Sequence, residues 1–292
     1  MSAPLFVALP GNETMALRLA ALCGGDTGVL MISAFPDGEF HLRFRDDLTG
    51  RCVVLICTLA RPNDKIVPLL FAADAARQLG ARKVGLVAPY LCYMRQDRSF
   101  KPGEAVTSRS FAALLSRACD WLVTVDPHLH RYKSLSEIYA IPARALHAGP
   151  AIAAWIGAHV TRPFLIGPDA ESRQWVGAVA GACGAGFAVL SKQRLGDRDV
   201  TSSLGDLRIP DGATPVLLDD IVSTGATMAE AIRLLGPLGA LPPVAIAVHG
   251  LLSDGAQPIL DAGLVTTNTV PGPAAAIDIS GLIAAGIADL VT

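Results

Sequence analysis

The chain is 292 residues long, which is enough to bury a large core and to form about two domains. Apolar residues make up 51% of it, with abundant Ala, Val and Leu and few aromatics, a composition typical of buried parallel strands covered by helices. The formal net charge of −2 argues against nucleic acid as the main partner, because faces that bind DNA or RNA carry a basic excess.

Six cysteines are scattered along the chain without a CxxC pair, and most lie in apolar runs such as 52–57. We interpret them as small buried side chains rather than ligands or disulfides, which favours a reducing cytoplasm. The N-terminus lacks the pattern of a signal peptide, and Asp278 and Asp289 interrupt the Ala-rich C-terminus. The sequence therefore predicts a cytoplasmic protein without a membrane partner.

Short apolar runs rich in β-branched residues alternate with helical stretches along the whole chain. The expected strands are, in chain order, 5–9, 29–34, 52–58, 83–88, 121–125, 164–167, 187–191, 215–218, 244–248 and 264–269. The helices expected between them include 64–79, 108–118, 151–158, 173–183 and 226–235. Such alternation predicts βαβ crossovers and parallel sheets.

The two halves of the chain resemble each other, because each has a strand that ends in an acid near a loop of ligand-binding type, at Asp126 and at Asp219. The Pro/Gly/Ala-rich stretch 141–150 is the expected boundary. We therefore predict two similar α/β domains, 1–145 and 146–292, with the last helix as a candidate to pack back on the first.

Two segments in the first half are too polar for their surroundings. Phe35-Pro36-Asp37-Gly38-Glu39 follows a strand directly, and because Pro-Asp-Gly is a strong turn former, a plain turn is the alternative to a binding loop. Residues 93–104 lie just beyond the strand expected at 83–88, at the carboxyl edge where open α/β sheets bind ligands. Arg95, Arg98 and Lys101 are suited to clamp polyphosphate oxygens, with a solvated charged loop as the alternative.

Three shorter segments also follow strands. Asp126-Pro127-His128 has His130 and Arg131 behind it, and its histidine is open to a structural or a functional interpretation, whereas His130 is expected to be structural. Gly167-Pro168-Asp169 ends the first strand of the second half. Lys192 and Arg194 stand two residues apart on an extended segment, so their side chains point to the same side, next to a loop able to close over an anion.

The most informative segment is 216–227. An apolar run, predicted as a buried parallel strand, ends in Asp219 and Asp220 and passes through a small turn into a helix. Such a turn aims unpaired backbone N–H groups at one point, beside several hydroxyl groups, and so predicts a phosphate site. The carboxylates would repel phosphate and fit sugar hydroxyls or a metal ion, so the segment describes a ribose 5-phosphate site; an ordinary capped turn is the alternative. The hydroxyls belong to Ser223, Thr224 and Thr227.

This segment resembles the phosphoribosyl-diphosphate (PRPP) binding motif, and six motifs in register resemble the ribose-phosphate pyrophosphokinases, or PRPP synthetases, from near the N-terminus to the last helix. The resemblance implies a pair of phosphoribosyltransferase-like domains, each a mostly parallel sheet flanked by helices. It implies transfer of the β,γ-diphosphoryl group of ATP to the anomeric hydroxyl of ribose 5-phosphate, with release of AMP and with Mg²⁺ as cofactor. The motifs are Phe35-x-Asp37-Gly38-Glu39, Arg95-Gln96-Asp97-Arg98, Asp126-x-His128, Pro168-Asp169, Lys192-x-Arg194 and the loop 219–227.

The family's residue roles carry over where the residues match, and they imply that the loop at Phe35 reaches into a neighbouring subunit's site, so that the protein self-associates. ATP binding is then expected at Phe35, Asp37, Glu39, Arg95, Gln96 and Asp97. Ribose 5-phosphate binding is expected at Asp219, Asp220, Ser223, Thr224, Gly225, Ala226 and Thr227. The Mg²⁺–phosphate centre is expected at His128 and Asp169, and catalysis at Lys192, Arg194 and His128.

The phosphate loop departs from the bacterial pattern. Bacterial-type members usually have Asp-Thr-Ala-Gly-Thr where this chain has Ser223-Thr224-Gly225-Ala226-Thr227, and this variant looks more like the archaeal branch. Control by ADP or phosphate is therefore not carried over. Two other interpretations stay open. A simple phosphoribosyltransferase needs one such domain and no adenine loop, and a non-catalytic regulatory homologue would have been favoured by loss of Lys192, Arg194 or His128.

Overall fold

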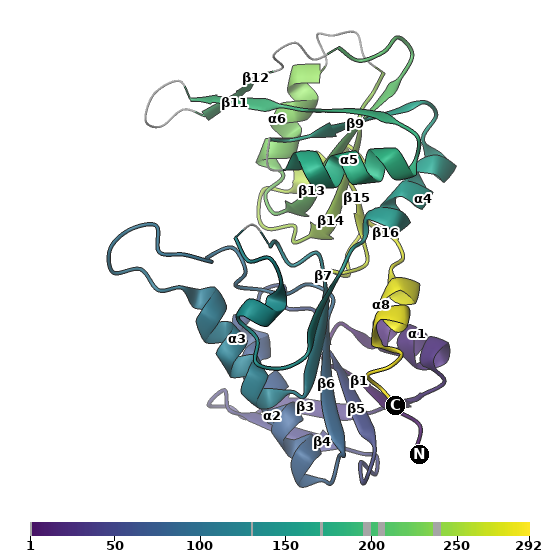
Figure 1. Ribbon diagram of the computed structural model, residues 1–292. Helices are drawn as coiled ribbons and strands as arrows, with labels where there is room; N and C mark the ends of the chain where they lie inside the picture. The colour runs from purple at the N-terminus through teal and green to yellow at the C-terminus, as the bar shows by residue number, and fades with distance from the viewer. Residues whose placement is uncertain (1, 130, 170–171, 195–199, 204–207, 236–240) are drawn as a thin grey trace. The chain divides into compact units, whose positions relative to one another are not determined.

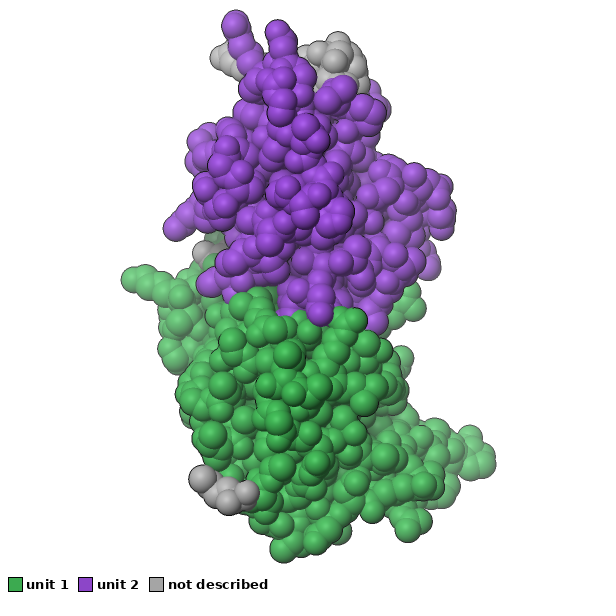
Figure 2. Space-filling view, turned by 90° about the vertical axis from the view of Figure 1, so that its right-hand side faces the viewer, with its two compact units in different colours: residues 1–146, 280–292 green, residues 147–279 purple. Residues whose placement is uncertain are grey.

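The computed structural model describes residues 2–129, 131–169, 172–194, 200–203, 208–235 and 241–292. The chain divides into two compact units, residues 1–146 with 280–292 and residues 147–279 (Figure 1, Figure 2). Each unit contains a six-stranded parallel sheet with helices packed against it. Two parallel sheets flanked by helices are the predicted fold class.

In the first unit the sheet has the order β2-β1-β5-β6-β7-β8, and all its neighbouring strands are parallel. The strands in the middle are buried apolar runs, because helices cover both faces: α1 packs on α8, and α2 packs on α3 (Figure 1). The strands are β1 (Leu5–Ala8), β2 (Asp26–Gly28), β5 (Cys52–Ile56), β6 (Lys83–Ala88), β7 (Trp121–Val125) and β8 (Ala143–Leu146). The helices are α1 (Glu13–Cys23), α2 (Asn63–Gln78), α3 (Thr107–Ala118), the 3-10 turn η1 (Leu135–Glu137) and α8 (Ser280–Ile287).

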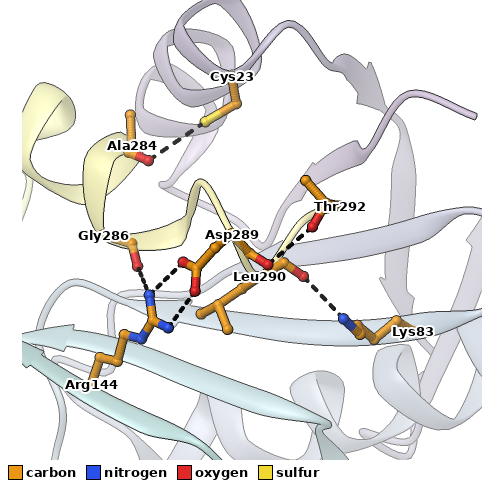
Figure 3. Close-up of polar contacts among 8 residues, drawn as sticks. All are labelled: Cys23, Lys83, Arg144, Ala284, Gly286, Asp289, Leu290 and Thr292. Carbon is orange, nitrogen blue, oxygen red and sulfur yellow. Dashed lines mark hydrogen bonds and ion pairs between the residues drawn. The ribbon is translucent and has the colours of Figure 1, made fainter. Parts of the chain in front are cut away.

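The C-terminal segment 280–292 is part of the first unit, and Figure 3 shows its polar contacts with Cys23, Lys83 and Arg144. Ile283 and Ile287 of α8 are fully buried. The guanidinium of Arg144, on β8, donates to both carboxylate oxygens of Asp289 at 2.6 Å each, which lowers the pKa of that carboxyl. Apolar burial and a bidentate ion pair therefore both join the end of the chain to its first half. Further contacts join Lys83 to the carbonyl of Leu290, Arg144 to that of Gly286 and Cys23 to that of Ala284.

In the second unit the sheet has the order β10-β9-β13-β14-β15-β16, again with parallel neighbours. Helix α4 packs on α5, and α6 packs on α7 over a core drawn from α6, β13 and β14. The strands are β9 (Pro163–Gly167), β10 (Gly186–Val189), β13 (Thr214–Val222), β14 (Val244–Gly250), β15 (Val265–Thr267) and β16 (Ala275–Ile277). The helices are α4 (Gly149–His159), α5 (Arg173–Ala182), α6 (Ala226–Leu235) and α7 (Gln257–Asp261).

Each unit also carries a two-stranded antiparallel sheet at the same point of its topology, after the edge strand β2 or β10. In the first unit β3 (Leu30–Ala34) pairs with β4 (Phe40–Phe44), and in the second β11 (Ser191–Arg194) pairs with β12 (Val200–Ser203). The two sheet orders then match place by place, and β13 corresponds to β5. The acid-ended strands that suggested the repeat, β7 and β13, hold different places in their sheets.

Strand β13 is longer than the predicted strand 215–218. It continues through Asp219 and Asp220 to Val222, because its backbone keeps pairing with β14 as far as Gly250. The predicted bound at Leu218 was too early, because ladder hydrogen bonds to a buried neighbour outweigh the low strand propensity of Asp. The two carboxylates are therefore held by a rigid strand rather than by a loop.

All six cysteines are free thiols, and each is buried or half-buried. Burial raises the pKa of Cys57 and of Cys119 to about 12, so these thiols stay protonated and behave as small apolar groups. Within the described ranges, we find no helix with the length and apolar character that crossing a membrane requires.

Candidate active site

The turn between β13 and α6 is built around Gly225. This residue has a φ of +75°, in the left-handed region that glycine favours, and a Cβ there would lie 2.4 Å from Cγ2 of Ile259. Its carbonyl accepts the N–H of Ala229 at 2.8 Å, a first hydrogen bond of α6. The N–H groups at the start of α6 have no helical carbonyl to bond, which is the arrangement that binds phosphate.

Hydroxyl groups surround this turn. Thr224 and Thr227 are exposed, whereas Ser223 is half-buried. The Ser223 hydroxyl lies 3.0 Å from that of Ser253, and the Ser253 N–H donates to the Ser223 carbonyl at 3.1 Å. Sequence reasoning missed Ser253, whose only signal was its place after β14, the strand next to β13.

The two acids of β13 are half-buried, and the N–H of Asp220 donates to Oδ1 of Asp219 at 2.9 Å. Burial, followed by the charge of Asp220 and with a smaller effect of Asp169, raises the pKa of Asp219 to about 7. Hydroxyl donors or a cation would relieve this repulsion. The acids are thus suited to sugar hydroxyls or a metal ion, not to a phosphate.

Asp169 follows β9, which is the neighbour of β13 in the sheet, and so belongs to the same edge as Asp219. Its carboxylate accepts the N–H of Ser172 at 3.2 Å, and its carbonyl accepts the Ser172 hydroxyl at 2.6 Å. In the described part of the chain no three His, Cys, Asp or Glu side chains form a metal cluster. Mg²⁺ is usually held by one or two carboxylates together with substrate phosphates, so this donor set fits it.

In the first unit, Asp126 and His128 follow β7 in an unusual conformation. Their φ values are +36° and +53°, a region that residues other than glycine rarely adopt. The His128 N–H donates to the Asp126 carbonyl at 2.9 Å, and the Asp126 N–H donates to that of Leu146 at 2.9 Å. Such strain costs about 1–3 kcal/mol per residue and concentrates at functional sites. The backbone thus supports the functional interpretation of His128.

Arg95, Gln96 and Asp97 follow β6, the neighbour of β7, so the structure brings both segments to one sheet edge. Arg95 is exposed, while Gln96 accepts a hydrogen bond from the Thr107 hydroxyl at 3.2 Å. Asp97 is buried, and its carboxylate accepts Nη1 of Arg131 at 2.7 Å. Sequence reasoning left Arg131 out of the site, although it noted its position behind His128.

The Phe35–Glu39 segment is the tip of the β3–β4 hairpin, on a two-stranded sheet of its own. The N–H of Phe35 donates to the Glu39 carbonyl at 2.7 Å, and the N–H of Glu39 donates to Oδ1 of Asp37 at 3.1 Å. The side chain of Phe35 is 52% exposed. The segment is therefore a tight turn, and it presents an aromatic ring to its surroundings.

Lys192 and Arg194 lie on β11, extended as predicted, opposite Ser202 and Val200 of β12. The loop 195–199 that follows them lies outside the described residues.

A family model described as the N-terminal domain of ribose phosphate pyrophosphokinase matches residues 5–119, and a phosphoribosyl transferase domain model matches residues 134–261. A curated ribose-phosphate pyrophosphokinase of Methanopyrus kandleri is 34% identical over 94% of both chains. The chain belongs to the ribose-phosphate pyrophosphokinase family. The Sulfolobus acidocaldarius member of this family is 35% identical over 81% of this chain and 83% of its own.

A solved structure of this family agrees with the fold. Phosphoribosylpyrophosphate synthetase from Mycobacterium smegmatis superposes with a TM-score of 0.84 at 25% identity, over 99% of each chain. Both units of this chain are therefore the units of a ribose-phosphate pyrophosphokinase, and the predicted family is confirmed.

Proposed function

We propose that this chain transfers the β,γ-diphosphoryl group of ATP to the 1-hydroxyl of ribose 5-phosphate and releases AMP and PRPP. The observation that carries the proposal is the β13–α6 segment. There, two half-buried acids precede a turn at a helix N-terminus, and that turn requires the positive φ of Gly225. A simple phosphoribosyltransferase is disfavoured, because the chain has a second unit of the same topology that matches the N-terminal pyrophosphokinase model.

The sugar phosphate is bound by the second unit. The first-turn N–H groups of α6 and the loop hydroxyls hold the 5-phosphate, and the carboxylates of Asp219 and Asp220 accept hydrogen bonds from the ribose hydroxyls. Gly225 keeps the loop compact against Ile259. The 5-phosphate residues are Ser223, Thr224, Gly225, Ala226 and Thr227.

The nucleotide is bound through the first unit. Arg95, which is exposed, neutralises phosphate charge, and Gln96 and Asp97 belong to the same loop. Phe35, at an exposed hairpin tip, stacks on adenine in a neighbouring subunit's site. Asp37 and Glu39 accept hydrogen bonds from the amino group of that adenine. The protein is then a homo-oligomer, since one subunit alone lacks a complete site.

Transfer requires the 1-hydroxyl oxygen to attack the β-phosphorus of ATP, while the bond from that phosphorus to the α–β bridging oxygen breaks. AMP leaves with that oxygen, and the hydroxyl proton is released to solvent. Mg²⁺ on the phosphates would neutralise their charge, and Asp169, at the same sheet edge as Asp219, is suited to hold it. Lys192 and Arg194 meet the charge that develops on the transferred group. Positioning and electrostatics carry such reactions, with little covalent work for the protein.

The free thiols suit a reducing compartment, and we place the reaction in the cytoplasm. The test is incubation with ATP, Mg²⁺ and ribose 5-phosphate, followed by separation of the nucleotides. We expect AMP and PRPP in equal amounts, and an Asp220→Ala variant with a KM for ribose 5-phosphate raised at least several-fold, since a charge-assisted hydrogen bond contributes about 1.5–3 kcal/mol. A protein that binds both substrates without forming PRPP would instead be the regulatory homologue.

A further inference from the structure

Two loops of the first unit are joined by a buried ion pair. The β6–α3 loop (residues 89–106) carries Asp97, and the β7–η1 loop (residues 126–134) carries Arg131; their side chains meet at 2.7 Å. The Asp97 side chain is only 3% exposed, whereas that of Arg131 is 43% exposed. A carboxylate as buried as this requires a polar partner, and Arg131 supplies one to Asp97.

The same two loops are joined a second time through Tyr132. Its hydroxyl donates to the backbone carbonyl of Asp97 at 3.2 Å and lies 3.0 Å from the hydroxyl of Ser108, at the start of α3. Tyr132 and Ser108 are both buried. The Ser108 N–H donates to the carbonyl of Gln96 at 3.3 Å, so the backbone around Gln96 and Asp97 is fixed from two sides.

Arg131 also reaches the outer part of the β6–α3 loop. Its guanidinium carbon lies 5.7 Å from the ring centre of Phe100, and that of Arg98 lies 4.9 Å from the same ring. These distances are those of cation–π contacts. Arg131 therefore contacts this loop at two points on either side of Arg98, at Asp97 and at Phe100.

The Asp97 carboxylate is thus directed into its own unit, while its neighbour Arg95 is exposed. We propose that Arg131, supported by Tyr132, is a positioning residue that holds the β6–α3 loop in the conformation that presents Arg95 and Gln96 to the nucleotide. Asp97 acts through Arg131 and does not contact the nucleotide itself. The inference rests on the proposed function in one respect, that the ligand of this loop is ATP.

The test measures binding of a non-hydrolysable ATP analogue in the presence of Mg²⁺, and separately of ribose 5-phosphate, by titration calorimetry. Arg131→Gln removes the charge opposite Asp97 and frees the loop, so we expect analogue affinity to fall about tenfold, as for the loss of a charge-assisted hydrogen bond, with ribose 5-phosphate affinity unchanged. Asp97→Asn should cause the same loss. The double variant should be no weaker than the weaker single variant, because both changes remove one interaction.

Arg117→Gln is the matched control, an exposed arginine in the last turn of α3, and it should bind both ligands as the wild type does. If Arg131→Gln does not fold, Arg131→Lys, which keeps the charge, should show a smaller loss of the same kind. Wild-type analogue affinity in the folded Arg131 variants, equal weakening of both ligands, or additive losses in the double variant would overturn the inference. Absence of PRPP formation by the wild type would overturn the proposed function alone, because the binding comparison does not depend on turnover; a wild type that does not bind the analogue would overturn both.

Discussion

Gly225 is subject to two separate constraints. Its φ of +75° strains any residue with a Cβ, and that Cβ would also press on Ile259 at 2.4 Å. Gly225→Ala should therefore destabilise the second unit by about 1–3 kcal/mol through overpacking and should displace the phosphate loop. Urea unfolding and the KM for ribose 5-phosphate measure the two effects.

Gly255 is subject to the first of these constraints but not to the second. It has a φ of +95° in the same unit, but a Cβ there meets no atom within 4 Å. Gly255→Ala should cost only the conformational strain and leave the KM for ribose 5-phosphate unchanged. Equal effects of the two substitutions on stability and KM would show that contact with Ile259 does not shape the loop.

Asp219 should make stability depend on pH. Its pKa in the folded protein is raised from an ordinary 3.8 to about 7, so the folded state binds the proton more tightly than the unfolded chain does. Well below its ordinary pKa of 3.8 the group is neutral in both states. As the pH rises from about 4 to about 7, the unfolded chain ionises first, and the folded protein loses stability on the order of a few kcal/mol.

Urea unfolding at pH 5 and pH 8 in Mg²⁺-free buffer tests this direction. Asp219→Asn should flatten the dependence and stabilise the protein at pH 8, because it removes a buried charge from beside Asp220. Asp211→Asn, at an exposed acid before β13, is the control and should keep the wild-type slope. The assignment fails if the two variants have the same slope.

At the scale of elements, the helices and strands with a clear pattern of buried apolar residues are the ones that the sequence predicts correctly. Strand β7 and helix α6 were predicted with their observed bounds, because a buried apolar run and a helical apolar stripe each have one interpretation. Strand β4 (Phe40–Phe44) and helix α1 were not predicted, and β13 extends past its predicted end at Leu218. Those features depend on pairing and packing partners that lie far away in the sequence.

The candidate site shows the same limit. The turn from Ser223 to Gly225 and the loop at His128 were located from their local residue patterns. The partner of Asp97 was not, since nothing local in the sequence directs its carboxylate to Arg131 rather than to a ligand. Local sequence motifs predict which loops form a site, whereas the contacts that fix those loops can be identified only from the folded structure.

The β3–β4 hairpin should affect activity more than stability. The Phe35 side chain is 52% exposed, so Phe35→Ala removes little buried surface and should leave the unfolding temperature nearly unchanged. If the ring stacks on adenine, the KM for ATP should rise at least several-fold. Phe71→Ala on α2, at a ring that is 51% exposed, is the matched control and should keep the wild-type KM.

Mixing two impaired variants, at an ATP concentration that saturates the wild type only, tests whether that hairpin serves a neighbouring subunit. Lys192→Ala should lose on the order of 10²–10³ in kcat, as for removal of one preorganised charge. Mixed with Phe35→Ala under conditions in which subunits exchange, it should regain part of the activity through hybrid sites. No recovery after demonstrated exchange contradicts a shared site.

At the scale of the whole molecule, the order of the chain does not follow the division into units. The first unit contains both ends of the sequence, and the second unit is inserted between Leu146 and Ser280. Helix α8 packs against α1, β7 and β8, so the first unit is complete only when the last residues are in place. The stability of the first unit therefore depends on the C-terminal segment.

Two substitutions in that segment decide whether apolar burial or the ion pair dominates. Ile287 is fully buried, and Ile287→Ala should cost about 2–5 kcal/mol. Asp289→Ala should have a much smaller effect, because the Arg144 and Asp289 side chains are 40% and 66% exposed and surface pairs contribute little. Hydrogen exchange gives the readout: Ile287→Ala should lower protection across α1, β7 and β8, while β13 and β14 keep theirs. If the loss is confined to α8, or if Asp289→Ala is the more damaging change, the C-terminal helix does not complete the first unit by burial.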